Sequence, residues 1–144
     1  LYGNFISSEG AKAISNALKN CNAGSGCSNI LEELYIGGNN IADDGAIAFS
    51  KLLKSNESRL KTLYLNGNNI RQNGLVSIAR SLRNNTFLNE LDIQWNYMNN
   101  FTANEFKSML EINAQLRVLL LSGANNYRNI ELCSFEKDIV RKKC

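Results

Sequence analysis

Few residues in this 144-residue chain are suited to catalysis. The chain has no His, so the commonest general base and the usual neutral metal ligand are missing. Glu32 with Glu33, and Asp43 with Asp44, are adjacent carboxylates that point in different directions, as surface charges do. We find no nucleophile beside a base, no glycine-rich phosphate loop and no cluster of metal ligands in the sequence. The sequence therefore predicts a protein that is not an enzyme and has no catalytic, cofactor-binding or metal-binding residue.

The four cysteines are the remaining reactive groups, and their spacing gives only a weak signal. They are Cys21, Cys27, Cys133 and Cys144, and no C-x-x-C pair occurs among them. We favour free thiols in a cytoplasmic protein, because disulfides are rare in that compartment. A pairing of Cys21 with Cys27 stays open.

A second kind of chemistry, recognition of another protein, fits the aromatic and polar side chains that recur along the chain. Tyr, Trp and Arg dominate the binding energy of protein interfaces, and this chain has a single Trp. The alternative is that Tyr35 and Tyr64 only pack on each other as neighbours on adjacent strands. The residues predicted to bind a protein partner are Glu33, Tyr35, Thr62, Tyr64, Asn66, Glu90, Asp92, Gln94, Trp95 and Tyr97.

These residues are spaced by an internal repeat. The pattern L-x-x-L-x-L begins at Leu31, Leu60 and Leu88, with a weaker copy at Leu116. The starts at 31, 60, 88 and 116 give periods of 29, 28 and 28 residues. Self-similarity at such a period is typical of repeat proteins, and this pattern is the leucine-rich one.

Each L-x-x-L-x-L segment predicts a short strand with one buried face. Side chains alternate across a strand, so Leu34 and Ile36, and their equivalents in the other repeats, point into the core. The residues between them point outward. An asparagine follows each strand at a fixed offset, and a buried amide must find hydrogen-bond partners, so we expect a structural role. This structural ladder is predicted to contain Asn4, Asn39, Asn68 and Asn96.

A helix is expected after each strand. Its first turn is marked by Gly10, Gly45, Gly74 and, off the pattern, Thr102. Apolar residues follow one, four and eight positions later, which places them on one helical face. Strands joined by helices lie parallel, so stacked repeats bury the faces that one repeat leaves open.

We expect one leucine-rich-repeat domain over residues 1–144. Its parts are a partial repeat (1–30), three repeats (31–59, 60–87 and 88–115) and a terminal repeat with a cap (116–144). Because Leu1 occupies a mid-strand position, we expect a fragment of a longer chain. Residues 19–30 form an extended loop, and Ile130, Phe135 and Val140 belong to the expected cap.

The full motif, L-x-x-L-x-L-x-x-N-x-I with a glycine opening a helix, resembles the ribonuclease-inhibitor-like class of leucine-rich repeats over about residues 1–125. That class includes ribonuclease inhibitor, the sensor domains of NOD-like receptors, the activator of the Ran GTPase and the tropomodulins. The resemblance implies an α/β solenoid, a right-handed horseshoe fragment with a parallel sheet on the concave side and helices on the convex side. It also implies a cytoplasmic location.

The function expected from the sequence is protein binding through the concave sheet, as part of a NOD-like-receptor-type sensor or a ribonuclease-inhibitor-like scaffold. The alternative is a regulator of a small GTPase or an actin-binding capping protein. The formal net charge of +3 is too small to point to nucleic acid, and no apolar run is long enough to span a membrane. We therefore expect no nucleic-acid, membrane or small-molecule partner, and the identity of the protein partner is not encoded in any motif.

Overall fold

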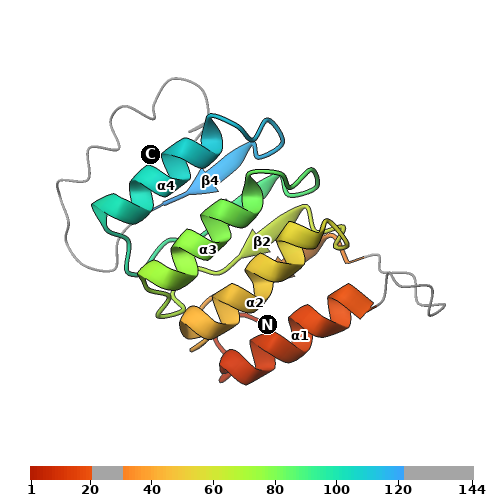
Figure 1. Ribbon diagram of the computed structural model, residues 1–144. Helices are drawn as coiled ribbons and strands as arrows, with labels where there is room; N and C mark the ends of the chain where they lie inside the picture. Colours follow the sequence, from red (N-terminus) through yellow and green to blue (C-terminus); the bar gives the residue numbers. More distant parts are fainter. Residues whose placement is uncertain (21–30, 122–144) are drawn as a thin grey trace.

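Strands and helices alternate along the whole of the computed structural model, which describes residues 1–20 and 31–121. The helices are α1 (Ser8–Asn20), α2 (Ala42–Ser55), α3 (Gln72–Leu82) and α4 (Asn100–Leu110). The strands are β1 (Glu33–Tyr35), β2 (Thr62–Tyr64), β3 (Glu90–Asp92) and β4 (Val118–Leu120). Figure 1 shows the four helices side by side, covering one side of the sheet.

The sheet is parallel and keeps the order of the sequence, β1-β2-β3-β4. Equivalent residues of successive repeats are register partners, so that Leu34 lies beside Leu63, Leu63 beside Leu91, and Leu91 beside Leu119. This is the α/β leucine-rich-repeat solenoid that the repeat pattern predicts, and the fold prediction is confirmed. The four cysteines, most of the 19–30 loop and the expected cap lie outside the described residues.

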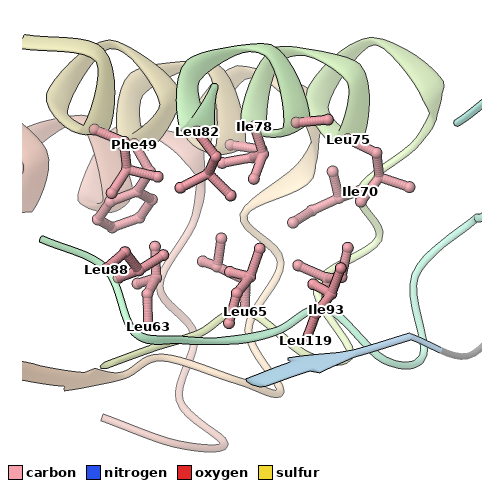
Figure 2. Close-up of a cluster of buried hydrophobic side chains, with 14 of the residues drawn as sticks. Phe49, Leu63, Leu65, Ile70, Leu75, Ile78, Leu82, Leu88, Ile93 and Leu119 are labelled. Carbon is pink, nitrogen blue, oxygen red and sulfur yellow. The ribbon is translucent and has the colours of Figure 1, made fainter. Parts of the chain in front are cut away.

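The core lies between the helices and the sheet, as Figure 2 shows. Leu63 and Leu65 point into it from β2 and the residue after it, and Ile78 and Leu82 approach from α3; all four are fully buried. Burying each large apolar side chain stabilises the fold by about 1.5–3 kcal/mol. This gain is repeated in each layer and supplies the main driving force for stacking.

The first turn of each helix lies close to its neighbour, and this explains the glycines. A Cβ on Gly45 would lie 2.8 Å from Ala11 Cβ of α1, and one on Gly74 would lie 3.0 Å from Ala46 Cβ of α2. In α4 the equivalent residue is Thr102, which forms a capping box with Asn99. The Thr102 backbone N donates to Asn99 Oδ1 at 2.9 Å, and Thr102 Oγ1 accepts from Asn99 N at 2.9 Å. The departure from glycine therefore supplies a cap to the helix.

Candidate protein-binding face

The face of the sheet that points away from the helices carries the predicted binding residues. Register alignment sets them in rows across the repeats. We call this set the strand face: Glu33, Tyr35, Thr62, Tyr64, Glu90, Asp92, Val118 and Leu120, with Asn66, Gln94, Trp95 and Tyr97 beyond the carboxyl ends of the strands.

Two tyrosines form the centre of the strand face. The rings of Tyr35 and Tyr64 meet edge to face, with centroids 4.8 Å apart and an interplanar angle of 76°. Both phenols also donate hydrogen bonds, Tyr35 to Glu33 Oε2 at 2.8 Å and Tyr64 to Glu90 Oε1. These bonds to carboxylates raise the pKa of both phenols, so both remain protonated donors at neutral pH. The tyrosines therefore pack on each other and also orient two carboxylates.

Asp92 departs from the expected exposure. It lies on the outward face as predicted, but only 6% of its surface is exposed. Its register neighbours are the bulky Tyr64 and Leu120, and Oδ1 accepts a hydrogen bond from Gln94 N at 2.9 Å. Burial raises the pKa of the Asp92 carboxyl, and the bond from Gln94 opposes that shift. An outward direction therefore does not make Asp92 exposed, because alternation along a strand sets direction and large neighbours set exposure.

Trp95 is the most exposed aromatic residue of the strand face, at 62%. Its backbone is left-handed, with φ of 58°. The equivalent residues of earlier repeats are Gly3, Gly38 and Gly67, with φ of 68°, 67° and 64°. A position that is glycine in every other described repeat is thus occupied by the largest side chain. Bulky residues are genuine outliers in this conformation.

Tyr97 lies two residues beyond Trp95 and is 37% exposed. The guanidinium carbon of Arg71 lies 5.2 Å from the centre of the Tyr97 ring, a cation–π contact between adjacent repeats. Thr62, Asn66 and Gln94 are half-buried. Of the predicted aromatic residues, the structure therefore brings Tyr35 and Tyr64 into contact on β1 and β2, and places Trp95 and Tyr97 in the turn after β3.

The predicted asparagine ladder separates into three buried members and one exposed member. The Asn68 amide donates to Leu65 O in its own repeat at 3.0 Å and to Ile36 O in the preceding one at 2.9 Å, while Oδ1 accepts from Asn39 N at 3.1 Å. Asn39 and Asn96 make equivalent bonds. Asn4 is instead exposed and, among the described residues, bonds only to Leu1 O and Tyr2 O of its own turn.

The structure also shows a second ladder that sequence analysis missed, in the turns that lead from helix to strand. Asn85 donates to Leu53 O at 2.9 Å and accepts from Leu88 N at 2.8 Å. Asn113 donates to Asn85 O at 3.1 Å and accepts from Leu116 N at 2.8 Å. In the preceding turn, Ser58 occupies the equivalent position and accepts a hydrogen bond from Leu60 N. The signal was an asparagine three residues before Leu88 and Leu116, which the shorter spacing at Ser58 obscured.

The described residues contain no group of three His, Cys, Asp or Glu side chains placed to bind a metal. None of the described helices has the length and apolar character needed to cross a membrane.

Comparisons with known proteins agree with this architecture. The Leucine Rich repeat family profile matches residues 27–50 and 59–79. No curated protein sequence gives a significant match. Among solved structures, 44 chains match, including Leiomodin-1 Actin-Binding Site 2 at a TM-score of 0.67 and 20% identity. That match covers 84% of this chain but 65% of the leiomodin chain. The repeat pattern, the parallel register and these matches together identify the chain as a leucine-rich-repeat solenoid of α/β type.

Proposed function

We propose that this chain is a non-catalytic protein-binding module that holds its partner on the strand face, which forms the concave side of the solenoid. The observation that carries the proposal is Trp95. A left-handed backbone costs a residue other than glycine about 1–2 kcal/mol. An exposed indole in a glycine position adds no packing to the core that would offset this strain energy. Such local strain is concentrated at functional sites.

The residues around Trp95 support the same function. Aromatic side chains give large contact area and have few rotamers, so ordering them on binding costs little entropy. Adjacent strands are about 4.8 Å apart, so the four described strands span about 15 Å. A standard interface buries roughly 800 Å² on each partner, and a patch of that area is nearly twice as wide as the four strands. We therefore expect residues 1–144 to supply part of a larger interface and to bind weakly alone.

Site-specific photo-crosslinking tests the proposal. A benzophenone amino acid is placed at Thr62 or Gln94 on the strand face, and at Lys51 or Lys107 on the helical side as matched controls. We expect the strand-face positions to crosslink a discrete protein, and an excess of unlabelled wild-type chain to suppress the product. Trp95→Ala should compete poorly, because truncating an interface hot spot costs about 2 kcal/mol or more.

Two outcomes of the same experiment would contradict the proposal. Equal crosslinking from the helical side, or competition by Trp95→Ala and Tyr64→Ala as strong as by wild type, would move the binding surface to the helices or to the 19–30 loop.

Within this function, we assign the chain to the ribonuclease-inhibitor-like class, in which it would act as a scaffold or as a NOD-like-receptor-type sensor. The glycine in the first turn of α1, α2 and α3 and the asparagine after β1, β2 and β3 support that class. A second candidate is actin binding, supported by the similarity in fold to an actin-binding site of leiomodin. Co-sedimentation with actin filaments and binding to monomeric actin test it, and a panel of small GTPases tests the related regulator role.

The proposed module works in the cytoplasm, where Cys21 and Cys27 would be free thiols. We expect both to react rapidly with a thiol reagent in the native, unreduced protein. If they react only after reduction, the protein belongs to an oxidising compartment.

A further inference from the structure

The charges on the strand face are all of one sign. Its acidic side chains are Glu33, Glu90 and Asp92, and none of its members is Lys or Arg, although Arg71 contacts it at Tyr97. The chain as a whole is basic, with a formal net charge of +3. The negative face is therefore not a consequence of composition, and it complements a positively charged partner.

Asp92 is the most unusual of these carboxylates. It is buried beside Tyr64 and Leu120, and within residues 1–20 and 31–121 no cation pairs with it. One hydrogen bond, from Gln94 N, is the only one its carboxylate accepts from the described chain. A buried carboxylate is costly unless a cation or several donors compensate it.

Three residues close to Asp92 in the chain or in register have side chains whose chemistry suits one kind of group. Glu90 lies two residues before it on the same strand and is held by the Tyr64 hydroxyl through one oxygen. Leu120 gives an apolar neighbour in register, and the exposed Trp95 follows after three residues. The chain's own Arg71 already lies over Tyr97, which shows that a guanidinium is accommodated on an aromatic ring at this end of the face.

We propose that the partner inserts an arginine side chain at Asp92, with its guanidinium between the Asp92 and Glu90 carboxylates and the Trp95 indole, and its aliphatic stem on Leu120. Arginine fits better than lysine because its planar head bonds a carboxylate through two N–H groups and stacks on an aromatic face at the same time. Tryptophan is the best aromatic acceptor for such a cation. This inference rests on the proposed function and names the partner chemistry for the same face.

The test uses the single tryptophan as the reporter. Three capped tripeptides are titrated at low ionic strength, Gly-Arg-Gly, Gly-Lys-Gly and Gly-citrulline-Gly, the last being a neutral isostere of the first. Binding is followed by Trp95 fluorescence and by the indole N–H signal in NMR spectra. We expect saturable binding of the arginine peptide, at least about threefold weaker binding of the lysine peptide, and no saturation with citrulline.

Two variants complete the design. Asp92→Asn should weaken arginine binding about tenfold, the value of a hydrogen bond to a charged group. Glu111→Gln removes the same charge from an exposed position at the end of α4 and should leave binding within about twofold, because screening weakens distant exposed charges. Because the peptide comparison is made on the wild-type chain, it decides the question even if a variant folds poorly.

The outcomes separate the two proposals. If citrulline binds as well as arginine, or if the arginine peptide gives no saturable signal at Trp95, the arginine proposal is wrong. Photo-crosslinking then tests the protein-binding face independently, because it does not depend on the charge of the partner.

Discussion

The turns and the strand face of this solenoid follow opposite rules. In the turns from strand to helix, Asn39, Asn68 and Asn96 occupy the same position and make the same bonds in three successive repeats. On the strand face, the row of Tyr35, Tyr64, Asp92 and Leu120 changes from aromatic to acidic to aliphatic. Both rows are only a few residues apart along the chain, so they share a backbone and differ in what constrains them.

The difference shows which constraint acts where. A turn amide must satisfy backbone groups of two repeats at once, so any other side chain leaves buried donors and acceptors unpaired. A strand-face side chain contacts side chains of its own and adjacent strands and does not have to satisfy backbone groups of two repeats, so it is free to vary. Identity between repeats therefore reflects a structural demand. Departures from the repeat differ in kind: Thr102 caps α4, whereas Trp95 in a glycine position stays exposed, and we propose that it serves binding.

The largest effect should come from the core beneath both rows. Leu63 is fully buried in β2 between two other repeats. We expect Leu63→Ala to lower the free energy of unfolding by about 2–5 kcal/mol, through lost burial and the cavity it leaves. Denaturant melts measure this, with Thr62→Ala on the same strand as the control. A loss below about 1 kcal/mol would contradict the register.

Turn and face are compared directly by Asn68→Ala and Asn66→Ala. The first removes the acceptor for Asn39 N and the donors to Ile36 O and Leu65 O, and should cost about 1–3 kcal/mol. Asn66 is half-buried, and its amide makes no hydrogen bond within the described part of the chain, so its loss should cost less than about 1 kcal/mol.

The ranking of these two variants in thermal or denaturant melts is the decisive result. If Asn66→Ala costs as much as Asn68→Ala, the distinction between a structural turn and a free strand face does not hold.

The sequence predicted the elements that depend on repetition. Period and alternation placed Leu63, Leu65, Leu91 and Ile93 in the core and Asn68 in the turn, because these depend on local spacing and on hydrogen-bond demand. It did not predict the burial of Asp92, since exposure depends on the size of neighbours that come from other repeats. It also missed the ladder through Asn85 and Asn113, because the preceding turn has Ser58, which lies one residue closer to its leucine.

The glycine position offers a sharper test of the comparison. Trp95→Gly removes a left-handed strain of about 1–2 kcal/mol but makes the unfolded chain more flexible, which offsets about 0.4–1 kcal/mol. We expect a net gain of up to about 1.6 kcal/mol in stability. Trp95→Ala keeps the Cβ and its strain while it removes the indole, so it serves as the matched control. If both variants destabilise the fold, the indole has a structural role and Trp95 is not free for a partner.

The smallest effect, and the most informative for the strand face, is the pH dependence of Asp92. Burial raises its pKa above the ordinary value of 3.8, so the folded chain binds this proton more tightly than the unfolded chain does. Stability then falls as the pH rises through that raised pKa, and the penalty is absent below the ordinary value. Asp92→Asn keeps an acceptor for Gln94 N and removes the charge, so we expect it to be more stable than wild type at pH 7.

That gain should shrink as the pH falls and vanish near pH 3, which chemical denaturation at a series of pH values measures. Glu111→Gln, at an exposed position, corrects for the change in net charge. A gain that persists unchanged at low pH would mean that packing, and not the desolvated charge, limits stability at this position. A gain confined to neutral pH would mean that the repeat retains a carboxylate that weakens the fold, and the same carboxylate would then be the group that a cationic partner compensates on binding.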